Sequence, residues 1–157
     1  MTGETLLLQM LPYNNTAMII HLNSISIYVL DLERAVRFYV DKLGFEVHTD
    51  ILVDEDRKWV SLYTAAQPQL QIMIIPVEEG VLFKPIQAQK MRDLIGEQFF
   101  SYGVFKCEDV KATYEALKAK GVNFIMEPGE GFLGQYEAAF IDDSGNWFRL
   151  TQDTDAV

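Results

Sequence analysis

Cysteine is nearly missing from this chain of 157 residues, in which Cys107 is the only one. A disulfide within the chain is therefore excluded. A chain of this length can bury about two thirds of its unfolded surface, so it needs no such cross-link to fold. Thiols become reactive in positively charged surroundings. Because Glu108 and Asp109 follow Cys107 closely, we expect this thiol to pack inertly rather than act as a nucleophile.

Basic residues and long apolar runs are also scarce. The chain has 13 Lys and Arg against 23 Asp and Glu, which gives a net charge of -10. Such a charge disfavours binding to nucleic acid or to anionic membranes. No run approaches the roughly 20 apolar residues that span a bilayer, and no cationic region precedes the apolar run Leu6 to Met10 as it would in a secretory leader. We therefore expect a cytoplasmic protein with neither nucleic acid nor membrane among its partners.

The chain does contain an internal repeat with a spacing of 78 residues. Asp31 and Asp109, which are 78 positions apart, each begin a helical pattern, and Gly44 and Gly121 end these patterns. An internal duplication determines the architecture and places sites where the two copies meet. Four residues at matching places in the copies are therefore candidates for a pocket: Ser24, Gln71, Tyr102 and Arg149.

Hydrophobic periodicity predicts the same order of elements in both copies. The first copy is predicted to contain a strand at 24–29, a helix between Asp31 and Gly44, and strands at 45–53, 58–63 and 70–75. The second copy is predicted to contain a strand at 99–107, a helix at 109–120, and strands at 122–126, 136–141 and 147–152. The predicted fold is α+β, with two tandem βαβββ modules that form a curved mixed sheet around a trough.

The expected domain organisation is one domain made of these two modules. Its parts are an N-terminal extension at 1–20, the first module at 21–76, a linker at 77–98 with a short helix starting at Pro85, the second module at 99–152 and a tail at 153–157.

Several segments resemble the vicinal oxygen chelate superfamily. In the first copy these are Ile27 to Ala35 and Leu43 to Phe45; in the second they are Glu108 to Val110, Lys120 to Val122 and Asp142 to Asn146. That superfamily includes glyoxalase I, extradiol dioxygenases, and the fosfomycin and bleomycin resistance proteins. The resemblance covers about residues 20–152 and implies a glyoxalase-like fold. It also implies a homodimer, because such modules commonly pair in this superfamily.

The resemblance also implies where a metal would be bound in metal-dependent members. Histidines would occupy the positions of Ser24 and Tyr102, a glutamate would occupy that of Arg149, and Gln71 holds the matching place in the first module. A divalent metal prefers imidazole and carboxylate ligands, and a guanidinium cannot bind one. We therefore expect no metal and no cofactor. The alternative is one divalent metal such as Zn, Ni, Mn or Fe.

Alternate side chains of strands around a trough point into it. The candidate ligand-binding residues are therefore Ser24, Tyr28, Gln71, Tyr102, Trp147 and Arg149, with Trp59 and Tyr136 at the mouth. Aromatic rings with a few polar groups are typical of small-molecule pockets, although Trp59 suits a core position equally well. Arg149 is expected either to bind a carboxylate or phosphate of the ligand or to pair with Glu137 on the adjacent strand.

The sequence leaves more than one function open and identifies no catalytic residue. We favour a protein of the glyoxalase and bleomycin resistance kind that binds a small organic molecule in the trough without the usual metal. The alternative is a metal-dependent lyase or dioxygenase with substituted ligands, so the sequence does not decide whether the protein is an enzyme. A third hypothesis is a subunit whose trough serves only for dimerisation.

Overall fold

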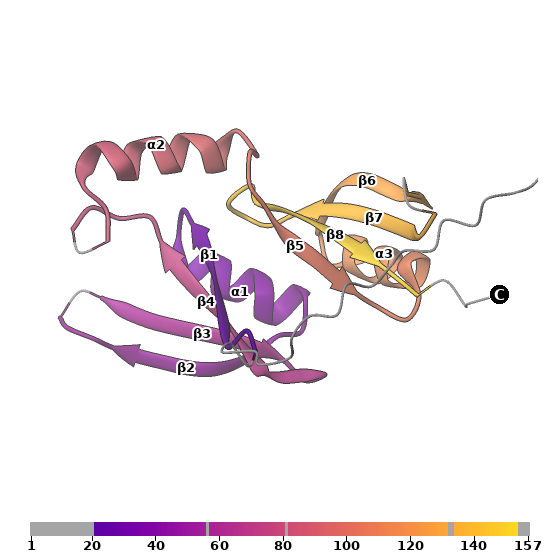
Figure 1. Ribbon diagram of the computed structural model, residues 1–157, viewed down its shortest axis with the longest axis horizontal. Helices are drawn as coiled ribbons and strands as arrows, with labels where there is room; N and C mark the ends of the chain where they lie inside the picture. Colours follow the sequence, from indigo (N-terminus) through magenta and orange to yellow (C-terminus); the bar gives the residue numbers. More distant parts are fainter. Residues whose placement is uncertain (1–20, 56, 81, 132–133, 154–157) are drawn as a thin grey trace, which may run out of the picture.

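The computed structural model describes residues 21–153 except 56, 81, 132 and 133 (Figure 1). The predicted N-terminal extension at 1–20 and residues 154–157 of the predicted tail lie outside this part. The first module contains β1 (Ser24–Val29), α1 (Leu32–Arg37) with a π-helical turn η1 (Phe38–Lys42), β2 (Glu46–Leu52), β3 (Lys58–Thr64) and β4 (Gln67–Pro76). The connection forms α2 (Pro85–Gly96). The second module contains β5 (Ser101–Lys106), α3 (Val110–Ala119), β6 (Asn123–Glu130), β7 (Tyr136–Ile141) and β8 (Trp147–Thr151).

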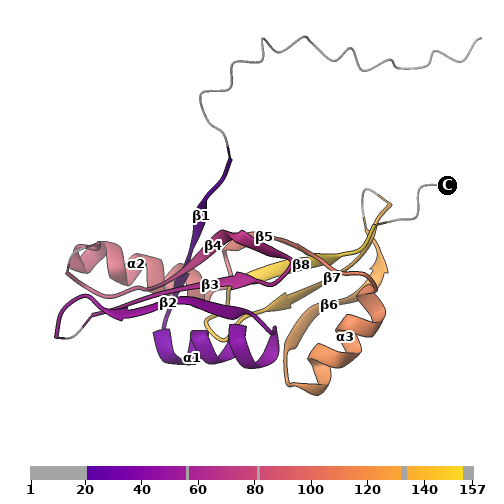
Figure 2. The same ribbon diagram turned by 90° about the horizontal axis from the view of Figure 1, so that it is seen from below.

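Each module forms its own sheet of four strands, with matching topology. The strand orders are β1-β4-β3-β2 and β5-β8-β7-β6. In each sheet the first strand pairs in parallel with the last, and the remaining pairs are antiparallel. In Figure 2, α1 and α3 lie on the same side of the two sheets. The predicted α+β fold of tandem modules is confirmed, with two sheets that do not close into a barrel.

The two module helices begin in the same way. The Oδ1 atom of Asp31 accepts a hydrogen bond from the Arg34 amide at 2.8 Å, and Asp109 does the same for the Ala112 amide at 2.8 Å. Such side-chain caps satisfy an amide that has no partner within the helix. After each helix a glycine, Gly44 or Gly121, adopts a φ of 77°, which favours glycine.

One hydrophobic core connects the modules. The fully buried Tyr39 of η1 packs with its ring edge against Phe148 of β8, with 6.3 Å between the ring centroids. Phe45 and Phe105 make a similar contact between the modules at 5.6 Å. A smaller core lies beneath α2, where Ala88 and Ile95 pack with Val77. The modules are therefore held together mainly by aromatic packing.

The helices of the structure are short. Among the described residues, none is both long and apolar enough to cross a lipid bilayer.

Candidate functional site

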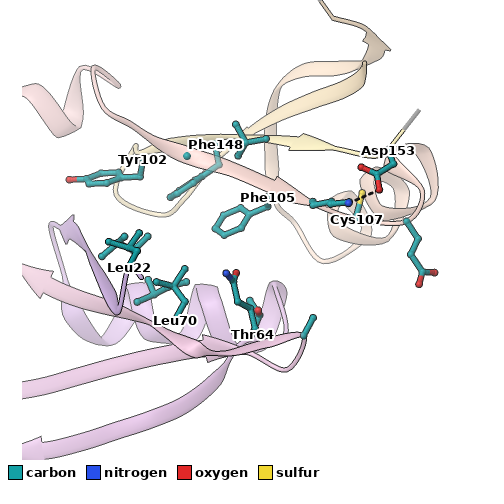
Figure 3. Close-up of a pocket in the computed structure, with 16 residues that line it drawn as sticks. Leu22, Thr64, Leu70, Tyr102, Phe105, Cys107, Phe148 and Asp153 are labelled. Atoms are coloured by element: carbon teal, nitrogen blue, oxygen red, sulfur yellow. Dashed lines mark ion pairs between the residues drawn. The ribbon is translucent and has the colours of Figure 1, made fainter. Parts of the chain in front are cut away.

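The largest concavity of the described structure is a cleft between the two modules, with a volume of about 1040 Å³. Figure 3 shows Leu22 and Leu70 of the first module across the cleft from Tyr102 and Phe105 of the second. The buried ring of Phe148 lies at its floor. The lining also includes Ile25, Thr64, Ala66, Gln67, Ile72, Gly103, Val104, Lys106, Cys107, Glu108 and Asp153.

Side chains from the second module seal the free edge of β1. The Tyr28 amide donates to the Tyr102 hydroxyl at 3.2 Å, and the Leu30 amide donates to Ser144 Oγ at 3.0 Å. The Asn146 side chain donates to the Tyr28 carbonyl at 2.9 Å. An unpaired strand edge is open to other partners, so these three bonds close this side of the junction between the modules.

The matching edge of β5 lacks such a seal, because the repeat differs at the residues concerned. The positions 78 residues before Ser144 and Asn146 are Ala66 and Pro68, which carry no hydrogen-bonding side chain. The position 78 residues after Tyr28 is Lys106, which lines the cleft together with Ala66. The cleft therefore occupies the place where the second seal would lie.

The open edge presents backbone polar groups to the cleft. The Cys107 amide donates to the Thr151 carbonyl of the tail of β8 at 2.8 Å. Because successive residues of a strand direct their amides to opposite sides, the amide and carbonyl of Lys106 face away from β8, toward the cleft. They supply one donor and one acceptor beside an aromatic wall.

Tyr102 belongs to the cleft through its ring. The register of β5 shifts between Ser101 and Gly103, and the Tyr102 ring stacks on Phe148 at 6.3 Å on the core side of the sheet. Burial, with smaller electrostatic contributions, raises the pKa of Tyr102 to about 12. The phenol therefore stays neutral near pH 7 and does not act as a base there.

Arg149 pairs with Glu137, as one of the two sequence hypotheses expected. Its Nη1 atom lies 3.2 Å from Glu137 Oε2, and the Glu137 side chain is only 8 % exposed. Gln135 Nε2 also approaches this carboxylate at 3.4 Å. The pair lies on β7 and β8, on the face of the sheet opposite Phe148 and Leu150.

The other sequence candidates are spread over several surfaces. Ser24 and Gln71 lie opposite each other in the β1 and β4 register. The Tyr28 ring packs edge-on against Phe83 at 5.6 Å, and Trp59 is 43 % exposed at the far end of the first sheet. Tyr136 packs against the main core, and Trp147 lies opposite Ser101 and Ile141. Of the eight candidates, all within the described residues, only Tyr102 lines the cleft.

The sequence analysis did not single out Leu70, Phe105 and Phe148, which form much of the cleft. Their apolar character is that of ordinary core residues, so periodicity alone does not distinguish them. The difference between the two copies at Ala66 and Pro68 was the available indication of an unsealed edge.

The residues at the four presumed ligand positions do not fit a divalent metal. Ser24 and Gln71 offer a hydroxyl and an amide, Tyr102 is a neutral phenol turned to the core side, and the Arg149 guanidinium cannot coordinate a cation. No group of three or more His, Cys, Asp or Glu in the described part of the chain is arranged to hold a metal ion. His48 contacts Thr49 Oγ1 at 2.9 Å.

Comparison with known proteins gives a consistent set of relatives. A family model described as the Glyoxalase/Bleomycin resistance protein/Dioxygenase superfamily matches residues 21–150. The uncharacterized protein YetH of Bacillus subtilis (strain 168) is 29 % identical over 136 residues, which are 86 % of this chain and 100 % of YetH. The crystal structure of UcmS2 is 36 % identical with a TM-score of 0.79, over 85 % of this chain and 98 % of UcmS2.

A more distant structural relative is TnmS3, an antibiotic binding protein from Streptomyces sp. CB03234. Its crystal structure is 21 % identical with a TM-score of 0.67, over 87 % of this chain and 98 % of TnmS3. At this identity the similarity concerns the fold.

Proposed function

The chain belongs to the Glyoxalase/Bleomycin resistance protein/Dioxygenase superfamily, and we propose that it binds a small organic molecule, without a metal ion, in the cleft between its modules. The observation that carries this proposal is the aromatic cleft of about 1040 Å³ left by the unsealed edge of β5. Small-molecule sites are concave and mostly apolar, with a few polar groups that fix orientation. The antibiotic-binding role of TnmS3 is consistent with such a use of the fold.

The lining indicates the kind of ligand. A flat apolar or aromatic body matches Phe105 and Phe148, and burying it removes apolar surface from water on both partners. A carbonyl, hydroxyl or amide at its edge would pair with the backbone groups of Lys106, which are otherwise open to the cleft. The Lys106 side chain pairs with Asp153 at 2.5 Å, so the ligand needs no formal charge.

Titration with N-phenyl-1-naphthylamine, a neutral aromatic dye, tests the proposal. We expect saturable fluorescence enhancement with one site per chain. Leu70→Trp fills the cleft and should weaken binding at least about tenfold, because overpacking excludes the ligand. Ile86→Trp, on the exposed surface of α2, is the matched control and should bind as the wild type does. Equal binding by Leu70→Trp would contradict this location.

We also propose that the protein forms a homodimer, as its module repeat and the superfamily suggest. Size-exclusion chromatography with light scattering would give about twice the chain mass if this is correct, and the mass of a single chain if it is wrong.

A further inference from the structure

A second concavity lies within the first module. It is a groove of about 470 Å³ between β3 and β4, at the end of the sheet where Figure 1 shows the β2–β3 hairpin and the end of β4 separating. Its lining includes Leu32, Glu33, Leu52, Val53, Glu55, Arg57, Lys58, Trp59, Ile74, Ile75, Pro76, Glu78, Glu79 and Leu82. Among the described residues, it shares no lining residue with the cleft between the modules.

Pro76 explains why the strands separate. The last residues paired at this end of β3 and β4 are Val60 and Ile74, although β3 reaches Lys58 and β4 reaches Pro76. The Val77 amide donates to Val29 of β1, so by alternation Ile74 and Pro76 face β3. Proline has no amide proton to continue the ladder, and the Pro76 carbonyl accepts from the Glu78 amide at 3.1 Å instead.

The groove exposes unusually large apolar side chains. Leu52 is 71 % exposed, Leu82 59 %, Val53 58 % and Trp59 43 %. Isolated exposed apolar residues are ordinary, but apolar side chains gathered around a concavity indicate a binding surface. The groove therefore has the walls of a ligand site rather than those of a solvated turn.

The charge around the groove is negative. Four carboxylates line it, those of Glu33, Glu55, Glu78 and Glu79. Its two basic residues already have acidic partners. Arg57 pairs with Asp54, and Lys58 Nζ lies 3.3 Å from Glu33 and 3.2 Å from Asp50.

We propose that this groove is a second ligand site, for a small organic cation with a flat apolar body. The apolar body packs between Trp59 and Leu82, and the ammonium group lies beside Glu55 and Glu78. An indole ring also attracts a cation directly. The volume of about 470 Å³ suits a small molecule, and the acidic rim selects a cation over a neutral or anionic compound.

Titration followed by amide NMR shifts tests this proposal, with (naphthalen-2-yl)methylammonium as the cation and 2-naphthalenemethanol as its neutral counterpart. We expect shifts at the groove residues, and a cation that binds about tenfold more tightly than the alcohol. The double variant Glu55→Gln/Glu78→Gln should weaken cation binding about fivefold. The control Glu97→Gln/Glu115→Gln makes the same change of net charge elsewhere and should leave the affinity unchanged.

Three results would overturn the proposal: equal affinities for the cation and the alcohol, shifts at Leu70 and Phe105 instead of the groove, or no shifts at millimolar concentration. Loss of self-association in Leu52→Glu would identify the groove as an interface between two copies and would also overturn it. Leu70→Trp distinguishes the two sites, because this variant should retain cation binding while losing the neutral dye.

Discussion

At the scale of single residues, Asp142 links the two modules. Its Oδ1 accepts hydrogen bonds from the amides of Ser144, Gly145 and Asn146, each at 2.9 Å. Its Oδ2 accepts from the Tyr39 hydroxyl at 2.7 Å, and the Asp142 side chain thereby joins η1 to the β7–β8 turn. Burial and this carboxylate raise the pKa of Tyr39 well above its usual value.

Asp142→Ala should lower the free energy of unfolding by about 4 kcal/mol, because several buried donors lose their acceptor. Asp142→Asn should lose less, since an amide oxygen can still accept from the turn. Urea denaturation at pH 7 measures both variants. Asp41→Ala, at an exposed position, is the control and should change stability by less than about 0.5 kcal/mol. Equal losses for Asp142→Ala and the control would refute this role.

The neighbouring Asp143 opposes folding above mildly acidic pH. Burial, followed by repulsion from Asp142, raises its pKa to about 6, whereas an unfolded aspartate titrates near pH 4. The folded state therefore holds the proton more tightly, so this residue's contribution to stability falls as pH rises from about 4 to about 6 and stays low above that.

Asp143→Asn should remove this pH dependence. At pH 7 the variant should be more stable than the wild type by about 1 kcal/mol, after allowance for solvent screening and for the loss of the contact with Arg34. At pH 4 the two proteins should be nearly equal. Melting temperatures between pH 4 and pH 8 check this, and a constant difference across that range would show that Asp143 does not titrate as described.

Arg149 offers a test between its two sequence-based roles. Arg149→Met leaves the buried Glu137 carboxylate without its cation, so we expect a loss of about 2 kcal/mol in unfolding free energy at pH 7. Adding Glu137→Gln to the same chain should recover most of it. If Arg149→Met is as stable as the wild type, the ion pair contributes little and the guanidinium remains a candidate for an anionic ligand.

At the scale of elements, Gly145 fixes the turn before β8 against α2. It has a φ of 112°, and a Cβ atom there would lie 2.6 Å from the Ile95 carbonyl oxygen. Gly145→Ala should therefore cost about 3 kcal/mol, from both backbone strain and the clash. Gly44→Ala is the matched control, since Gly44 has a φ of 77° with nothing within 4 Å; it should cost only about 1 kcal/mol. Thermal denaturation compares the two, and similar losses would mean that α2 moves aside freely.

The elements themselves were largely predictable from the sequence. β1 and β7 have the predicted bounds, and both capping aspartates stand where the helical patterns begin. Periodicity works here because each strand has one face in the core. It failed for the orientation of Tyr102, because the register shift beside Gly103 interrupts the alternation. A glycine inside a strand was the local indication of such an irregularity.

At the scale of the whole molecule, the two modules are copies whose junctions differ. One junction is sealed by Tyr102, Ser144 and Asn146, and the other is open where Ala66 and Pro68 replace the sealing side chains. The repeat predicted the architecture, because duplication preserves topology. The location of the cleft depends on which few polar side chains one copy lacks, and this could be interpreted only with both junctions in view.

The metal-free proposal also concerns the whole protein. Protein purified without a metal-affinity column should contain no stoichiometric Zn, Ni, Mn or Fe by elemental analysis. Incubation with EDTA should change the melting temperature by less than about 1 °C, because a ligand that binds the native state would have stabilised it. Stoichiometric metal would contradict the proposal and favour a metal-dependent lyase or dioxygenase.

The most direct measurement of ligand binding between the modules is an amide and side-chain NMR titration with N-phenyl-1-naphthylamine. The account predicts the largest shifts at Leu70, Phe105 and Phe148, together with the Lys106 amide that faces the cleft. Shifts confined to Ser24, Gln71 and Arg149, or to the groove between β3 and β4, would contradict it, as would a protein that the dye leaves unchanged.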